Sequence, residues 1–163
     1  MRPEPTIEKE PVDKALEVAG IVAAIILIGL PLYYWGQIPS VVPTHYNGLG
    51  EPDDYGSKWS IAILPVLGVA MFVGLLWLNR FPHKFNYPQK ITESNAQKQY
   101  KSATRLIRIL AVMVTASFAY LTYTVILTSL GSMSGPGKYF ALFFTVAMLI
   151  FPLAYYLTAR KAT

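Results

Sequence analysis

The sequence predicts an all-α membrane protein with four transmembrane helices, both termini in the cytoplasm and an ordered extracytoplasmic loop between the first two helices. Three observations lead to this fold class. Only 14% of the 163 residues are charged and 53% are hydrophobic, whereas a soluble domain has about 25% charged residues. The charged residues are clustered, and long uncharged stretches separate the clusters. Lysine and arginine are abundant only in alternate clusters, which is the pattern of a multi-pass membrane protein.

The four uncharged stretches are each long enough to cross a bilayer, because a transmembrane helix needs about 20 apolar residues. We predict spans at residues 15–35, 59–79, 106–130 and 139–159. They form one transmembrane domain at residues 15–163, preceded by a flexible cytoplasmic tail at residues 1–14 that is rich in proline and acidic residues. The first span is predicted to be retained, since no small-residue cleavage pattern follows it.

The positive charges predict the orientation, because lysine and arginine concentrate in cytoplasmic segments. The N-terminal tail, the connection between the second and third spans and the C-terminal end are rich in them. The other two connections hold only Lys58 and Lys138. We therefore predict a multi-pass protein of the cytoplasmic membrane with both termini inside the cell.

The net charge of +5 does not indicate nucleic-acid binding, because the basic residues lie between apolar spans. In that position they fit contact with lipid head groups. The chain contains no cysteine, which excludes disulfides, thiolate catalysis and cysteine-bound zinc. The partners we expect are the lipid bilayer and either other membrane-protein subunits or an extracytoplasmic peptide, and we expect no cofactor.

The first outer loop, residues 37–58, is the most informative segment. Its glycines and prolines exclude a continuous helix and favour a series of turns. Its polar groups are one imidazole, one amide, three carboxylates and one ammonium, on His45, Asn47, Glu51, Asp53, Asp54 and Lys58. Such an irregular segment is not expected in lipid, so we predict that it caps the helix bundle from outside.

The loop resembles the signature of a bacterial and archaeal membrane family of unassigned function. The shared run is I-P-x-x-V-P-x-H-Y-N-x-x-G-x-P-D-x-Y-G-S-K, which lies here between Ile38 and Lys58. A second stretch, from Phe85 to Arg105, is similar to the segment that follows the second span in that family. The resemblance covers residues 30–110 and implies a small multi-span protein.

The same domain forms the N-terminal part of the immunity proteins against the sporulation-delaying killing peptide. In that branch, the resemblance implies a role in recognising a toxic peptide and signalling its presence. The immunity proteins carry a further transmembrane domain, for which the 163 residues contain no counterpart.

The loop offers two interpretations of its charged groups. His45 with Asp53 and Asp54 has the imidazole and carboxylates that suit zinc, but a metal site needs about three protein ligands, and the second histidine is predicted on the other side of the membrane. We favour a structural role instead. In it, Asp53 or Asp54 accepts backbone hydrogen bonds in an Asx-turn and Lys58 pairs with a carboxylate.

Catalysis and ion transport are both disfavoured. The chain has no G-x-S-x-G motif, no H-E-x-x-H motif and no cysteine nucleophile, so we expect no enzyme. The core of each predicted span is free of Asp, Glu, Lys and Arg, whereas ion-coupled transporters usually place ionisable groups there. The residues described next favour ligand recognition over these two functions.

The outward half of the third span carries several hydroxyl groups at the expected depth of the loop. We predict a shallow outward-facing pocket lined by the loop residues His45, Asn47, Asp53, Asp54 and Lys58 together with Tyr120, Tyr123 and Thr124. The competing interpretation is hydrogen bonding between helices. From this predicted pocket we infer a non-enzymatic protein that recognises a peptide or a small ligand. The alternatives are an accessory subunit of a larger membrane assembly and, less favoured, a metal-dependent membrane enzyme.

The cytoplasmic middle segment is predicted to start a helix at Thr92, as its N-cap, and to continue into the third span. Spacings of three and four place four basic residues on one face of that helix, namely Lys98, Lys101, Arg105 and Arg108. We expect this basic face to contact anionic lipid or a partner protein.

Overall fold

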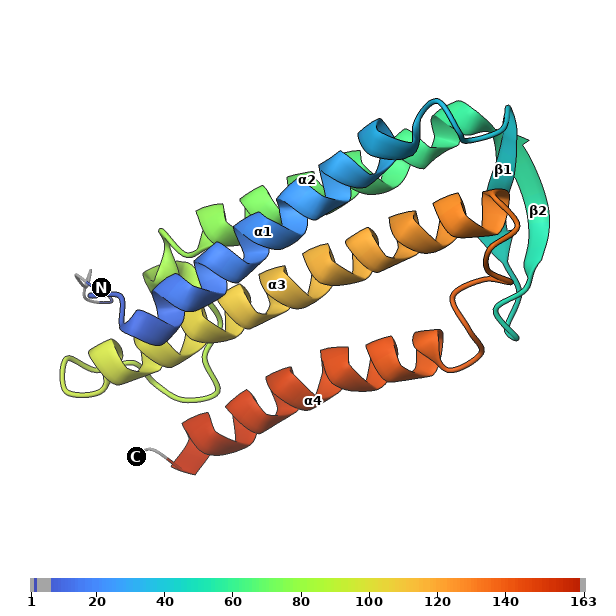
Figure 1. The fold of residues 1–163 in the computed structure, drawn as a ribbon. Helices are drawn as coiled ribbons and strands as arrows, with labels where there is room; N and C mark the ends of the chain where they lie inside the picture. The colour runs from blue at the N-terminus through green and yellow to red at the C-terminus, as the bar shows by residue number, and fades with distance from the viewer. Residues whose placement is uncertain (1, 3–6, 162–163) are drawn as a thin grey trace.

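A computed structural model describes residues 2 and 7–161, and in this part of the chain it contains four long helices and one two-stranded sheet. The long helices are α1 (Pro11–Tyr34), α2 (Ile63–Leu78), α3 (Ala96–Ser129) and α4 (Phe140–Lys161). The strands β1 (Val41–Tyr46) and β2 (Pro52–Ser57) lie between α1 and α2, and the short 3-10 helices are η1 (Lys58–Ala62) and η2 (Pro82–Lys84). The helices run side by side, with the hairpin at one end and both ends of the chain at the other (Figure 1).

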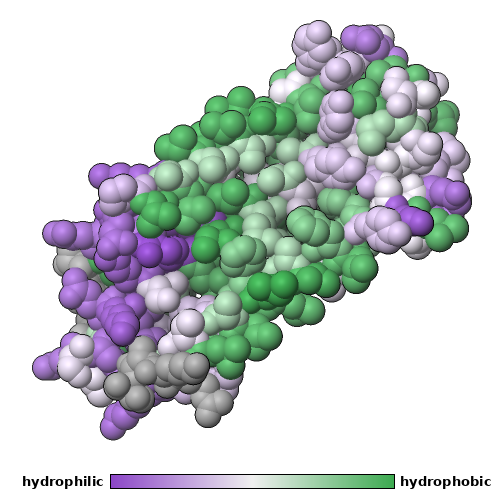
Figure 2. Space-filling model, turned by 60° about the horizontal axis from the view of Figure 1, so that its bottom comes forward, coloured by the Kyte–Doolittle hydropathy of each residue, from purple (hydrophilic) through white to green (hydrophobic). Residues whose placement is uncertain are grey.

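Four described helices are long and apolar enough to cross a membrane, which confirms the predicted number of spans. Their bounds are Pro11–Tyr34, Lys58–Leu78, Ala96–Ser129 and Phe140–Ala159. Figure 2 shows the matching surface: an apolar band covers the middle of the molecule, and hydrophilic residues gather at its two ends. The chain is therefore of the multi-pass membrane type, while the side on which each end lies stays a prediction.

Two helices begin earlier than the spans predicted from the sequence. Helix α1 begins at Pro11, so residues 11–14 of the predicted tail are helical, whereas residues 3–6 lie outside the described residues. Proline suits a first helical turn, because that turn leaves its backbone N–H groups unpaired in any case. The preceding Glu10 donates its backbone N–H to Asp13 at 3.0 Å, which closes the turn.

Helix α3 begins at Ala96, with Asn95 rather than Thr92 as its N-cap residue. The prediction for Thr92 is wrong because residues 93–95 form a separate turn before the helix, and the Thr92 hydroxyl contacts the Ser94 hydroxyl at 2.9 Å instead of a helix amide. The predicted continuation into the third span is correct. With 34 residues, α3 is about 50 Å long and exceeds the hydrocarbon core of a bilayer.

Helix α3 is the centre of the bundle, and α1 and α2 pack against it. Its Ala111, Thr115 and Ala119, spaced four apart, are buried. Glycines allow close approach of the other two helices. A Cβ added at Gly20 of α1 would lie 2.3 Å from the ring of Phe72 in α2.

Helix α4 is the least integrated element. It packs against α3, yet no residue of its most apolar window is buried inside the chain. Its exposed large apolar side chains are Leu142, Phe143, Val146, Leu149, Ile150, Phe151, Leu153, Tyr156 and Leu157. This surface needs lipid or another protein to cover it.

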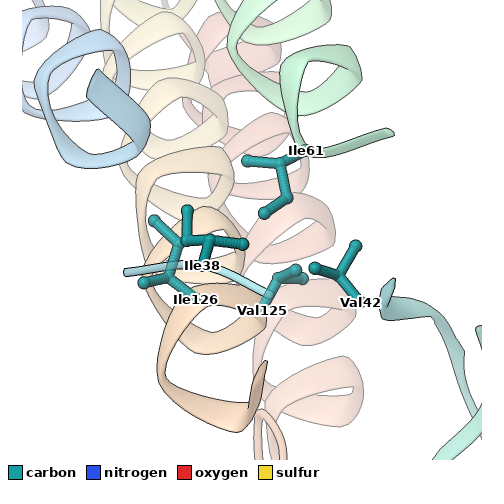
Figure 3. Packing of buried hydrophobic residues seen from close by; sticks show 5 residues of the cluster. All are labelled: Ile38, Val42, Ile61, Val125 and Ile126. Atoms are coloured by element: carbon teal, nitrogen blue, oxygen red, sulfur yellow. The ribbon is translucent and has the colours of Figure 1, made fainter. Parts of the chain in front are cut away.

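The hairpin is held on the end of the bundle by a small apolar core. Figure 3 shows five of its residues, from the loop before β1, from β1, η1 and the end of α3: Ile38, Val42, Ile61, Val125 and Ile126. The two strands are antiparallel, with Val42 opposite Gly56 and His45 opposite Asp54. The predicted loop is thus ordered, but it forms a sheet where only turns were predicted, so the fold is not purely α-helical.

Candidate functional site

The tip of the hairpin is organised by the side chain of Asn47. Its Oδ1 accepts hydrogen bonds from the backbone amides of Leu49 at 2.9 Å and Glu51 at 3.1 Å, and its Nδ2 donates to a Glu51 carboxylate oxygen at 3.2 Å. This is an Asx-turn. The sequence analysis placed such a turn at Asp53 or Asp54, but Asn47 forms it. Asp54 only accepts a bond from the adjacent amide of Tyr55, at 2.9 Å.

Glycines bring the hairpin tip against the loop between α3 and α4. Gly50 has a φ of +80°, and a Cβ there would lie 2.8 Å from the carbonyl carbon of Gly137. A Cβ on Gly135 would in turn lie 1.9 Å from the carbonyl oxygen of Gly50. The two backbones touch only because these positions lack side chains.

His45 and Asp53 form an exposed pair across the two strands of the hairpin. The His45 Nδ1 and the Asp53 Oδ1 are 2.6 Å apart, and the two side chains are 68% and 44% exposed. An exposed pair of this kind adds little to stability. No group of three or more His, Cys, Asp or Glu residues able to hold a metal ion occurs among the described residues.

Lys58 has a different partner from the predicted carboxylate. Its ammonium donates a hydrogen bond to the backbone carbonyl of Trp35 and lies 4.4 Å from the centre of the Trp35 ring. The cation therefore stabilises the C-terminal end of α1, where backbone carbonyls lack helical partners. Lys58 thereby holds the base of the hairpin against the end of α1.

A cavity of about 400 Å³ lies beneath the hairpin. Its wall comes from β1 and the hairpin tip, η1 and the start of α2, the C-terminal half of α3, the α3–α4 loop and the start of α4. Its lining residues include Pro43, His45, Asn47, Ile63, Leu121, Val125, Lys138, Phe140 and Ala141. Apolar side chains make up most of this wall, and the imidazole, the amide and the ammonium add polar groups. This combination is typical of ligand sites.

The predicted site residues divide into two groups. His45 and Asn47 line the cavity, whereas the remaining predicted residues do not: Asp53, Asp54, Lys58, Tyr120, Tyr123 and Thr124. The lining residues that the sequence did not predict come from β1, from η1 and the start of α2, from α3, and from the α3–α4 loop and the start of α4. For the α3–α4 loop the sequence did contain a signal, because Lys138 is the second of the two cations in the segments predicted to lie outside.

The three predicted α3 residues lie around the cavity in other roles. The Tyr120 hydroxyl donates a hydrogen bond to the Pro136 carbonyl at 3.0 Å, and its ring stacks on Phe140 at 5.0 Å. It thereby positions one lining residue. Tyr123 is exposed and Thr124 is buried. The bonds that α3 hydroxyls make are partly within the helix itself, as for Ser129 to the Val125 carbonyl at 2.7 Å.

Tyr46 lies on the inner side of the hairpin and also borders the cavity. Burial raises the pKa of this phenol above its usual range. The hydroxyl is therefore neutral across the physiological pH range and offers a hydrogen-bonding group without charge. Together with His45 it gives the cavity two aromatic polar groups.

At the opposite end of the bundle, acidic residues of the first helix meet the basic face of α3. Arg105 donates to both carboxylate oxygens of Asp13, at 2.9 and 3.1 Å, and Arg108 donates to Glu17 at 2.8 Å. Lys101 and Arg105 also contact Glu10. We call these six residues the acid–base cluster.

The acid–base cluster gives most of the basic face partners within the chain, and its contact with lipid or a partner protein stays a prediction. Three of the four basic side chains bind carboxylates of the same chain, and Arg108 is only 6% exposed. Lys98 alone of the four is exposed. Hydrogen bonds from Lys101 and Arg105 lower the pKa of Glu10, so its carboxylate stays charged. The segment predicted to be a flexible tail thus supplies the acids that the basic face binds.

These features define a class: a multi-pass α-helical membrane protein whose first connection folds as a β-hairpin over a cavity. Residues 22–69 match a family described as a domain of unknown function (DUF1648). An uncharacterized protein of Archaeoglobus fulgidus is 28% identical over 163 aligned residues, which cover 91% of this chain and 89% of the relative. No solved structure matches the chain.

The family match is centred on the hairpin. Its limits enclose the second half of α1, both strands and the first turns of α2. Both comparisons support the resemblance to a domain family of unknown function, and the shared segment is the one that forms most of the cavity wall.

Proposed function

We propose that the chain is a non-enzymatic membrane protein that recognises a peptide or a small ligand in the cavity beneath the hairpin, in the manner of an immunity protein or a sensor. The observation that carries this proposal is the cavity of about 400 Å³, which combines an apolar wall with His45, Asn47 and Lys138. A pocket of this size with few polar groups suits an apolar ligand that carries a small number of hydrogen-bonding groups.

Two further features support a peptide as the ligand. In the described part of the chain the sheet has two strands, so one edge of β2 bears backbone groups without a strand partner. Such an edge pairs readily with an extended peptide, while adjacent pockets take its side chains. The resemblance of the loop to the immunity family points to the same class of ligand.

The face on which the ligand binds follows from the positive charges. The hairpin end holds Lys58 and Lys138, whereas the opposite end carries most of the lysines and arginines. The proposal therefore places the cavity on the extracytoplasmic side of the cytoplasmic membrane. There it is open to ligands that arrive from outside the cell.

The proposal assigns no catalysis to His45. Its ring and the paired carboxylate of Asp53 are largely exposed, whereas catalytic dyads usually act in sites that exclude water. A metal-dependent enzyme is the least supported alternative, because a metal centre needs about three protein ligands.

A second candidate function is that of an accessory subunit in a larger membrane complex. The observation that favours it is the surface of α4, which is apolar along its length and makes its contacts mainly with α3. A helix of this kind offers a broad face to another transmembrane subunit.

Native mass spectrometry of the protein, purified in mild detergent from its own membrane, tests the proposal. We expect the parent chain to retain a bound peptide or small molecule. Ala141→Trp, which fills the cavity at the start of α4, should lose that species. Ala154→Trp is the matched control, because Ala154 is exposed on the same helix and does not line the cavity.

Three results would count against ligand recognition. They are a parent chain without any bound species, equal retention by both variants, and a bound species identified as bulk phospholipid. Other proteins present in fixed stoichiometry, with no small ligand, would instead favour the accessory subunit.

A further inference from the structure

A second cavity, of about 380 Å³, lies at the other end of the bundle, beside the acid–base cluster. It is formed where the beginning of α1 meets the end of α2 and the middle of α3. Its lining residues are Lys9, Glu17, Val73, Leu76, Trp77, Asn79, Arg80 and Arg108. None of them belongs to the cavity beneath the hairpin.

This second cavity carries an excess of positive charge. Three cations face one carboxylate, and that carboxylate, Glu17, is bound by Lys9 at 2.8 Å and by Arg108 at 2.8 Å. Arg80 follows the end of α2 and is exposed, and no ion pair holds its guanidinium within the described part of the chain. The lining therefore has a cation without a protein counter-ion.

Asn79 adds a polar group that lacks a protein partner. It is the C-cap residue of α2, and both its Oδ1 and its Nδ2 are buried without a hydrogen bond to any described residue. Leaving a buried amide unpaired costs about 1–3 kcal/mol, so such groups normally have a partner. A phosphate oxygen beside Arg80 would accept from the Asn79 amide and from the guanidinium together.

The other side of the cavity is apolar. Val73, Leu76 and Trp77 line it, and Trp77 is 54% exposed on the outside of α2. Trp77 also contacts Phe81, with the ring centres 5.1 Å apart. Aromatic residues of this kind lie at the head-group level of a bilayer, where an acyl chain begins.

We propose that this cavity binds the phosphate group of an anionic membrane phospholipid, with Arg80, Arg108 and Asn79 at the phosphate and Trp77 beside the acyl chain. Basic hollows between transmembrane helices at the inner surface are recognised sites for such head groups. A free phosphate ion has the same charge chemistry, but it would leave the apolar wall without a partner. The wall therefore favours the lipid.

Fluorescence quenching of Trp77 tests the proposal. The chain has three tryptophans, so Trp35 and Trp59 are replaced by phenylalanine, which keeps an aromatic ring at each position. The protein is placed in phosphatidylcholine vesicles that contain a fixed minor fraction of either brominated phosphatidylglycerol or brominated phosphatidylcholine. We expect stronger quenching by the brominated phosphatidylglycerol. One effective cation should enrich this anionic lipid roughly fivefold around Trp77, because a basic residue attracts anionic lipid by about 1 kcal/mol.

Two single variants locate the effect. Arg80→Gln should abolish the preference for phosphatidylglycerol, whereas Lys90→Gln, which removes the same charge from an exposed position outside the cavity, should keep it. Circular dichroism of each variant checks that the helices are intact.

Equal quenching by the two lipids in the parent would overturn the proposal, as would a preference that survives Arg80→Gln. A preference that soluble inorganic phosphate abolishes would assign the cavity to free phosphate and overturn the lipid assignment. None of these results depends on whether the cavity beneath the hairpin binds a ligand.

Discussion

Single glycines decide how closely the hairpin approaches the α3–α4 loop. At Gly50 a positive φ of +80° and a backbone contact with Gly137 occur together. Either feature alone disfavours a side chain, and their combination leaves no room for one. The shape of the cavity beneath the hairpin therefore depends on a residue without functional groups.

Gly50→Ala should lower the stability of the protein by about 1–3 kcal/mol, because it introduces both backbone strain and a clash. Gly48→Ala is the control, since a Cβ at Gly48 meets nothing within 4 Å and its φ is not positive. That change should leave stability nearly unaltered. Thermal unfolding of both variants in the same detergent measures the difference, and equal melting temperatures would contradict the packing described for the tip.

For single residues, the sequence indicated which positions lie near the cavity better than it indicated the partner of each side chain. His45 and Asn47, two of the predicted ligand-binding residues, line the cavity, and their part in binding stays a prediction. Lys58 was assigned a carboxylate partner because opposite charges lie near it in the sequence, whereas the folded chain offers it the carbonyl of Trp35. The partner of Lys58 depends on the position of the C-terminal end of α1 in the fold. The residues next to Lys58 in the sequence do not specify that position.

Between elements, the acid–base cluster joins the beginning of α1 to the N-terminal half of α3. Asp13 is 1% exposed and receives two hydrogen bonds from Arg105. Removing one partner of such a pair leaves the other charge buried, and that cost exceeds the net value of the intact pair. The ion pairs of the acid–base cluster therefore stabilise the packing of α1 against α3.

Arg105→Gln should lower the free energy of unfolding by about 2 kcal/mol. The loss should be smaller than for a fully buried ion pair, because the arginine side chain is partly exposed. Lys98→Gln, about two turns away on the same helix, removes the same charge at an exposed site and should alter stability by less than about 0.5 kcal/mol. Chemical unfolding of both variants checks this prediction. Similar losses in both would show that the pairing with α1 contributes nothing.

The helices were predictable because each span has a strong hydrophobic signal over about 20 residues. The hairpin was not, because its two strands of six residues contain proline and glycine and show no regular alternation of apolar and polar residues. Its order comes from long-range contacts of Val42 with Val125 and Ile126. The pairing of α1 acids with α3 bases is equally long-range, and a predicted tail gave no reason to expect it.

Across the whole molecule, the two ends differ in chemistry. One end has a hairpin, an apolar cavity and few lysines, and the other has the acid–base cluster and a basic hollow (Figures 1 and 2). An apolar band lies between them. If the bilayer covers that band, the two cavities open on opposite sides of the membrane.

Both proposals rest on the same orientation of the chain, with the hairpin outside the cell. Because the chain contains no cysteine, single cysteines can be introduced at exposed positions of each end, as Gly48→Cys at the hairpin tip and Glu93→Cys before α3.

Labelling of intact cells with a membrane-impermeant maleimide is the most direct measurement. The account predicts that the cysteine at position 48 is labelled in intact cells and that the cysteine at position 93 is labelled only after the membrane is opened. Labelling of position 93 but not position 48 in intact cells would invert the orientation and contradict the account.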